Sequence, residues 1–127
     1  MEVYKRKTFY QWQRKHQLSD SALAQAAKEL EDGLVDAALG GFLYKKRIAR
    51  TGGGKRAGYR VFISACLGRR HIFLYGLSKN DKSNITHEEM SALQFAGKVF
   101  LSLDAEALFH ALSVGVLIKV NSNEQAH

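Results

Sequence analysis

Two segments near the start of the chain carry apolar residues at helical spacing. Residues 7–16 place aromatic side chains three positions apart, on one side of a short helix. Ser19 or Asp20 then supplies an N-cap for a second apolar repeat over residues 23–30, and Gly33 follows as a C-terminal stop. The pattern predicts an N-terminal helical hairpin.

The middle of the chain changes to a strand-like pattern. Residues 42–48 form a first strand that ends before the three glycines at 52–54. Residues 59–67 alternate apolar and other side chains, and Gly68 with two arginines marks a turn into a further strand over residues 71–77. These segments predict a small antiparallel meander.

The last third of the chain is predicted to be helical with one closing strand. Thr86 and Glu89 have the spacing of a capping box and open a helix that runs past Phe100. Asp104 caps another short helix, and residues 116–120 form a strand. We expect an α+β fold: a small antiparallel β-sheet with the N-terminal hairpin and the C-terminal helices packed on one face.

Length and composition fit one compact unit. The chain has 127 residues, of which 46% are hydrophobic, so we expect a single domain over residues 1–120 and a polar tail over 121–127. No apolar run is long enough to cross a bilayer, and residues 1–7 lack the apolar segment of a signal peptide. With a single cysteine, Cys66, the chain is expected to be cytoplasmic, with no membrane partner.

The positive charge is concentrated in the middle of the chain. Residues 1–36 carry six basic and six acidic side chains, whereas residues 37–79 carry ten basic side chains and no carboxylate. The net charge of +7 therefore arises in this central block. A field of one sign attracts an anionic partner, most often a nucleic acid, although an ordinary solvated surface is the alternative.

The central block offers a candidate site for phosphoryl chemistry. On a strand, Lys45 and Arg47 point to one face and Lys46 to the other, and Arg60 of the next strand can join the first pair. Converging arginines suit the charge that develops on a phosphorane, and a lysine surrounded by cations has a lowered pKa that suits a general base. Phosphate binding without turnover remains the alternative.

Other chemistry has less support. The five histidines share no metal-ligand spacing with one another or with Cys66, and the central block has no carboxylate for Mg²⁺, so no metal and no cofactor are expected. Cys66 is expected to be a small core residue. His71 is expected on the surface of a turn, and Tyr75 either stacks on a base or fills the core.

The order of these motifs resembles a known family. A basic strand (residues 44–47), Lys55 and Arg56 after the glycines, a Gly-Tyr-Arg-Val strand start (58–61) and a strand-end lysine (79) follow one another. This order is similar to the RelE superfamily of toxins, closest to its HigB-like branch, over most of the chain. The resemblance implies a toxin that enters the ribosome and cleaves messenger RNA through the RNA 2′-hydroxyl, without a metal.

The resemblance also implies roles for particular residues. Lys45 or Lys46 would aid deprotonation of the 2′-hydroxyl, Arg47 and Arg60 would stabilise the phosphorane, and the strand-end Lys79 is retained. Further contacts to messenger or ribosomal RNA would come from the remaining basic and aromatic residues of the block, namely Arg50, Lys55, Arg56, Tyr59 and Tyr75. The partners implied are messenger RNA, the ribosome and a cognate antitoxin of helix-turn-helix type.

Two positions depart from the family pattern. Asn80 stands where RelE has a basic residue, and Thr86 stands where it has a tyrosine, so Lys79, Tyr75 and Arg56 remain as alternatives for the general acid. Two other functions also stay open. One is a toxin of the related ParE type that inhibits a protein such as gyrase, and the other is a protein that binds RNA or the ribosome without cleaving it.

Overall fold

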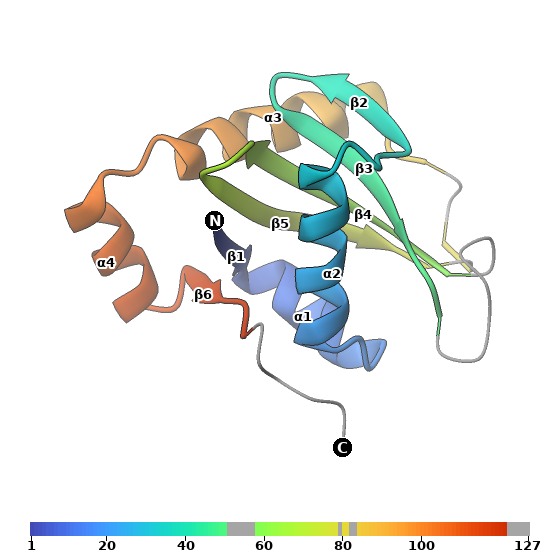
Figure 1. The fold of residues 1–127 in the computed structure, drawn as a ribbon, viewed down its shortest axis with the longest axis horizontal. Helices are drawn as coiled ribbons and strands as arrows, with labels where there is room; N and C mark the ends of the chain where they lie inside the picture. Colours follow the sequence, from blue (N-terminus) through green and yellow to red (C-terminus); the bar gives the residue numbers. More distant parts are fainter. Residues whose placement is uncertain (51–57, 79, 82–83, 122–127) are drawn as a thin grey trace.

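The computed structural model describes residues 1–50, 58–78, 80–81 and 84–121 (Figure 1). Its strands are β1 (Glu2–Arg6), β2 (Ala37–Gly40), β3 (Leu43–Ile48), β4 (Tyr59–Cys66), β5 (Arg70–Leu77) and β6 (Leu117–Lys119). Its helices are α1 (Lys7–Lys15), α2 (Asp20–Glu31), α3 (His87–Leu101) and α4 (Ala105–Ser113). The predicted α+β class, with helices at both ends of the chain and a central meander, is confirmed.

The six strands form one sheet in the order β2-β3-β4-β5-β1-β6. Neighbouring strands are antiparallel except β1 and β5, which run parallel. The sequence did not predict β1, because its polar residues show no strand pattern. Tyr4 and Lys5 of β1 are nevertheless buried, since the strand lies between β5 and β6, which are remote in sequence.

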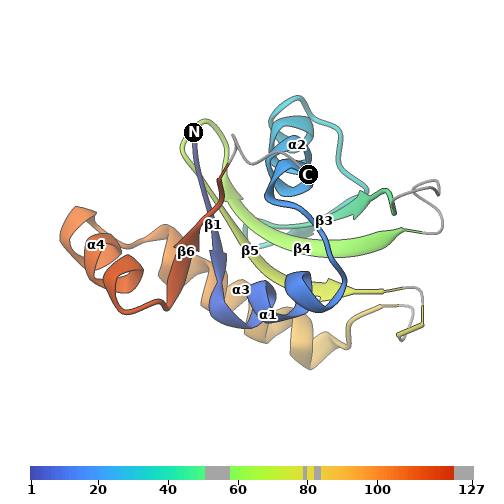
Figure 2. The same cartoon turned by 90° about the horizontal axis from the view of Figure 1, so that it is seen from below.

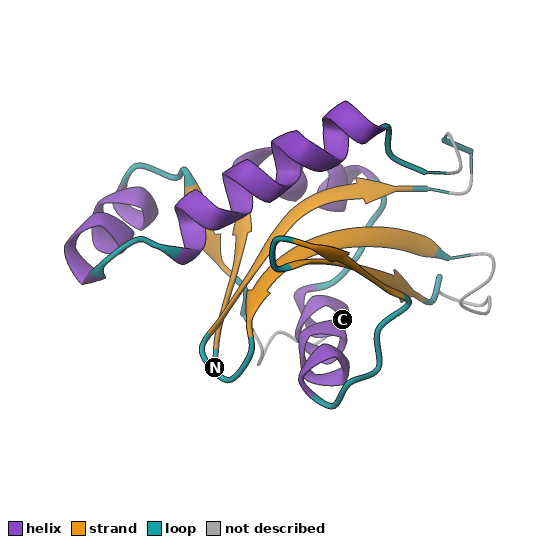
Figure 3. Cartoon of the chain, turned by 90° about the horizontal axis from the view of Figure 1, so that it is seen from above, coloured by secondary structure: helices purple, strands orange, loops and turns teal. Residues whose placement is uncertain are grey.

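The helices cover both faces of the sheet, so the prediction that they pack on one face is corrected. In Figure 2, α2 lies above the strands and α3 below them, and Figure 3 shows helices on both sides of the orange strands. The physical reason is visible along β4, where successive side chains point to opposite faces. Val61 and Ile63 belong to one buried cluster, whereas Phe62 belongs to the other.

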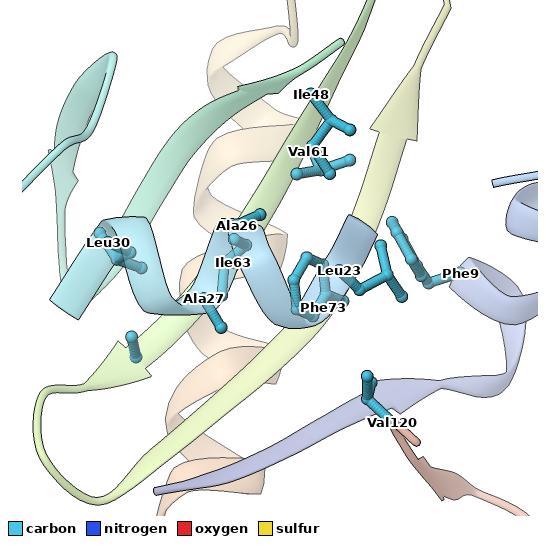
Figure 4. Close-up of a cluster of buried hydrophobic side chains, with 11 residues drawn as sticks. Phe9, Leu23, Ala26, Ala27, Leu30, Ile48, Val61, Ile63, Phe73 and Val120 are labelled. Atoms are coloured by element: carbon cyan, nitrogen blue, oxygen red, sulfur yellow. The ribbon is translucent and has the colours of Figure 1, made fainter. Parts of the chain in front are cut away.

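The cluster under α1 and α2 is shown in Figure 4, where the apolar side of α2 lies across the central strands. Each large side chain buried there stabilises the fold by about 1.5–3 kcal/mol. Gly76 of β5 allows α1 to approach closely, because a Cβ at this position would lie 2.5 Å from the indole ring of Trp12. The buried members of the cluster are Phe9, Leu23, Ala26, Ala27, Leu30, Ile48, Val61, Ile63, Ala65, Phe73 and Val120.

The second cluster lies between the sheet and α3 and α4. Gly97 brings α3 onto β4, because a Cβ at position 97 would lie 2.5 Å from the Cβ of Ser64 and collide with its hydroxyl oxygen. The buried members are Tyr4, Leu43, Phe62, Ile72, Leu74, Leu77, Leu93, Leu101, Ala111 and Leu117. Helices and their buried clusters therefore lie on both faces of the sheet.

The predicted N-caps of three helices are confirmed. Ser19 accepts a hydrogen bond from the Ala22 backbone at 3.1 Å, and Asp104 caps α4 in the same way. Thr86 and Glu89 form the reciprocal capping box of α3. Among the described residues, no helix combines the length and hydropathy needed to span a membrane.

Candidate functional site

The pairing of β3 with β4 gathers three cations on one face of the sheet. Arg47 lies directly opposite Arg60, and Lys45 lies opposite Phe62. Phe62 belongs to the cluster under α3, so the three cations share the α3 side of the sheet. We call Lys45, Arg47 and Arg60 the basic face.

Gly58 fixes the approach of the two strands beside this face. A Cβ at position 58 would collide with the carbonyl oxygen of Ile48 and would lie 3.0 Å from the backbone nitrogen of Arg50. A glycine is therefore required where β4 begins, and the following residues enter the ladder in a fixed register. This accounts for the glycine that precedes Tyr59 and Arg60 in the sequence motif.

The basic face places two guanidinium groups directly opposite each other. Like charges directly opposite each other destabilise a sheet, and Arg47 and Arg60 are such a pair. Asp36 offsets part of this cost: it accepts the Arg47 backbone N–H at 2.6 Å, and its other oxygen lies 3.8 Å from Arg47 Nε. The Arg47 side chain remains 45% exposed, so this carboxylate positions the guanidinium without covering it.

Lys46 does not join the basic face, so its position lends no support to the catalytic role predicted for it. Its side chain is only 4% exposed, and its Nζ lies 2.7 Å from Glu29 of α2. Alternation along β3 turns Lys46 to the face that α2 covers. Burying an ammonium group requires a paired carboxylate, and Glu29 provides it.

Two of the residues predicted to bind RNA lie on the other side of the β3–β4 pair. Tyr59 is opposite Ile48, which belongs to the cluster under α1 and α2. The Tyr59 ring lies 5.4 Å from both Trp12 and His16, measured between ring centroids. Arg50 is exposed and lines a cavity of about 390 Å³ together with Tyr59.

Tyr75 is half-buried on the same face as the three cations. It lies opposite Phe62, with the two ring centroids 6.1 Å apart. It also lines a hollow of about 180 Å³ with Arg6, Glu89, Ala92 and Leu93. Burial lowers the pKa of Arg6 below its ordinary value, and its Nε donates to the Leu74 carbonyl at 2.7 Å.

Some residues of the central block (residues 37–79) are buried. Arg70 is buried, contacts Glu2 at 3.1 Å and donates to three carbonyls at the end of α3. The expectation of a surface His71 is also wrong: the residue is fully buried, 3.3 Å from Glu31. Arg70 and His71 begin β5 in the middle of the sheet, so the adjacent turn does not expose them.

Three predicted site residues, Lys55, Arg56 and Lys79, lie outside the described residues. Cys66, expected in the core, is a free thiol at an intermediate degree of burial. Within the described ranges, no three His, Cys, Asp or Glu side chains are grouped so that they could hold a metal ion.

Sequence reasoning missed several residues around the two faces. Asp36, which lies just before β2, contacts Arg47. Its only signal in the sequence was its position as the last carboxylate before the central block. Lys15 and His16 at the end of α1 lie beside Arg50 and Tyr59. Nothing local indicates this contact, because it depends on how α1 packs on the sheet.

Comparison with known proteins gives a match along the chain. The sequence model of the family described as "RelE toxin of RelE / RelB toxin-antitoxin system" matches residues 1–120. The matched region includes all of the described strands and helices. A search among curated proteins gave no match.

Proposed function

Because the chain belongs to the RelE family of toxins from toxin–antitoxin systems, we propose that it is a metal-independent endoribonuclease that cleaves messenger RNA on the ribosome. The observation that carries this proposal is the direct pairing of Arg47 with Arg60, with Lys45 on the same face. Two guanidinium groups held on adjacent strands are suited to a phosphate that gains charge in the transition state.

The proposed reaction begins at the ribose next to the scissile phosphate. Lys45 assists removal of the proton from the 2′-hydroxyl, and the 2′-oxygen attacks the phosphorus. The bond to the 5′-oxygen breaks, and that oxygen leaves with a proton, giving a 2′,3′-cyclic phosphate and a 5′-hydroxyl end. Arg47 and Arg60 stabilise the charged phosphorane oxygens, so preorganised electrostatics supply most of the rate.

The remaining predicted residues have supporting roles in this proposal. Lys55, Arg56 and Arg50 anchor messenger or ribosomal RNA. Tyr75, which shares a sheet face with the three cations, is an alternative to Lys79 and Arg56 as the acid that protonates the leaving oxygen. Lys46 is left out, because its ion pair with Glu29 already accounts for it.

Membership of the family implies a cognate antitoxin as partner. We infer that this antitoxin, of helix-turn-helix type, inhibits the toxin by covering the basic face. A complex that leaves Lys45, Arg47 and Arg60 open to solvent would count against this mode of inhibition.

The cleavage chemistry is tested with ribosomes that carry a defined message. The purified protein, freed of bound metal by chelation and dialysis before the assay, should produce fragments with 2′,3′-cyclic phosphate and 5′-hydroxyl ends, the products of attack by the 2′-hydroxyl. A message with a single 2′-deoxyribose at the cleavage site should stay intact there, because the nucleophile is missing. Binding without cleavage would favour the RNA-binding alternative, and inhibition of DNA supercoiling without cleavage would favour the ParE-like one.

A further inference from the structure

A second candidate site lies on the opposite side of the sheet, where α1 ends beside the β3–β4 pair. A cavity of about 390 Å³ is lined there by Lys15, His16, Gln17, Leu18, Arg50 and Tyr59. This volume falls within the range of sites that bind small molecules. Its lining combines two permanent cations with two aromatic rings, which is the combination that single-stranded nucleic acids require.

The aromatic part of this cavity is fixed by the fold. Trp12, His16 and Tyr59 form a group in which the closest ring centroids, those of Trp12 and His16, are 4.8 Å apart. The Tyr59 hydroxyl donates to the His16 carbonyl at 3.4 Å, which joins β4 to the end of α1. Gly76 makes room for the Trp12 ring on the sheet, so the group has one defined position.

The rings of His16 and Tyr59 both line the cavity. Both residues have intermediate exposure, so neither ring is fully buried. A core tyrosine and histidine would normally be covered by apolar side chains. Here the cavity lining beside them is mainly polar or charged, with Leu18 as its aliphatic member.

The charge around the cavity is positive on balance. Lys15 and Arg50 are both exposed. Asp81 is a carboxylate near these cations: hydrogen bonds from the Ser78 backbone and hydroxyl lower its pKa, and the charges of His16 and Lys15 lower it further. Those two hydrogen bonds, at 2.8 and 3.0 Å, tie Asp81 to its own turn. This anion beside the two permanent cations therefore already has hydrogen-bond partners of its own.

We propose that this cavity is an RNA subsite that holds a nucleotide flanking the scissile one, with its phosphate between Lys15 and Arg50 and its base against His16 and Tyr59. The inference rests on the proposed ribonuclease function, because it extends the RNA path from the basic face. Tyr59 and Arg60 are consecutive, and alternation sends their side chains to opposite faces of β4. A strand of RNA that bends around the end of β3 and β4 contacts both sites.

The ligand class is tested first with small probes, by NMR titration of the isotope-labelled protein. Uridine 5′-monophosphate should give saturable shifts at His16 and Tyr59, whereas uridine and ribose 5-phosphate, which each lack one half of the nucleotide, should bind more weakly. Shifts that do not saturate, or that are equal for ribose 5-phosphate, would overturn the assignment of a base-binding site.

Variants then test the subsite with a single-stranded RNA oligonucleotide. Replacing both cations (Lys15→Ala with Arg50→Ala) should weaken binding about tenfold and reduce the salt dependence of the log affinity by about 0.7, the contribution of one neutralised phosphate of a single strand. Tyr59→Leu should weaken binding about tenfold through lost stacking. Lys7→Ala removes one charge from the other end of α1 and is the matched control, with wild-type affinity expected.

The outcomes separate this inference from the proposed function. If the wild type cleaves RNA and the cavity variants, folded by circular dichroism, cleave with unchanged KM, the subsite is wrong and the nuclease stands. If the nucleotide binds in the cavity but no RNA is cleaved, the nuclease is wrong and the binding site stands. If the variants lose affinity for the antitoxin and keep it for RNA, the cavity is a protein contact and the inference fails.

Discussion

Lys45 and Lys46 are adjacent on β3, yet they lie in opposite environments. Lys45 is half-buried on the α3 side of the sheet, and within the described part of the chain it has no carboxylate in ion-pair distance. Lys46 lies under α2, 4% exposed and paired with Glu29 at 2.7 Å. The same side chain therefore serves a proposed reaction on one face and holds a helix to the sheet on the other.

The two faces differ in how closely a carboxylate approaches the cations of β3. On the α2 face, Glu29 comes from a helix that crosses β3, so the cation is neutralised inside the fold. On the α3 face, Asp36 lies 3.8 Å from Arg47 Nε and leaves that side chain 45% exposed. Of the three consecutive cations of β3, Lys45 and Arg47 thus stay accessible to an external phosphate, whereas Lys46 is buried.

The largest expected effect is on Arg60. Arg60→Ala should lower single-turnover cleavage of a ribosome-bound message by about 10²- to 10³-fold, because a preorganised donor to the transition state is lost, while RNA binding weakens far less. Circular dichroism verifies the fold, and Lys7→Ala serves as a charge control. Full cleavage by a folded Arg60→Ala protein would remove this residue from the catalytic set.

The comparison of the neighbouring lysines predicts opposite phenotypes. Lys45→Ala should lower cleavage about 10²-fold and leave the free energy of unfolding close to wild type. Lys46→Met should lower the free energy of unfolding by about 2 kcal/mol, since Glu29 loses its nearest cation, and leave the activity of the folded fraction unchanged. Urea unfolding and single-turnover assays on both proteins measure the contrast. Equal effects of the two substitutions on cleavage would contradict the assignment of Lys45 to cleavage and Lys46 to stability.

Packing on the α3 face is tested at Gly97. Gly97→Ala should destabilise the protein by about 1–3 kcal/mol, because the new Cβ meets the Ser64 side chain in a close-packed layer. Adding Ser64→Gly should restore part of the loss by clearing the space. Thermal unfolding of the single and double variants gives the measurement, and additive losses would show that Ser64 is not the obstacle.

The smallest effect expected is the pH dependence from His71 under α2. Burial lowers the pKa of His71 below its ordinary value near 6.5, and Glu31 counteracts only part of this. Below pH 6.5, His71 of the unfolded chain becomes protonated while His71 of the folded protein is still neutral. Stability should therefore fall on acidification from 6.5 towards the folded pKa, by at most about 1.4 kcal/mol per pH unit.

The measurement for His71 is urea unfolding at pH 7.5 and 5.5. The difference between the two pH values should shrink in His71→Leu, whose side chain does not titrate. His87→Gln is the matched control, because His87 is exposed and its loss should leave the difference unchanged. An identical pH dependence in wild type and His71→Leu would show that His71 does not contribute.

Local signals predicted the elements well where the interactions are themselves local. The caps at Ser19, Thr86 and Asp104 bond within three residues, so their sequence spacing is sufficient. β1 was missed because its partners, β5 and β6, lie far along the chain, and neither its burial nor its parallel pairing leaves a local trace. His71 was predicted at the surface for a similar reason: the adjacent turn at Gly68 is visible in the sequence, whereas the packing that buries His71 is not.

The sequence by itself determined the family and the position of the central block. It also placed Lys45 and Arg47 on one face, because strand alternation follows from backbone geometry. The register of β3 with β4 added Arg60 to that face. Only the tertiary structure decided which cations remain at the surface. Lys46 and Arg70 are buried because Glu29 and Glu2 reach them from distant elements, and Lys15 and His16 lie beside Tyr59 because α1 docks on Gly76. Burial and ion pairing depend on residues from other elements of the fold, so they cannot be inferred from a residue and its sequence neighbours alone.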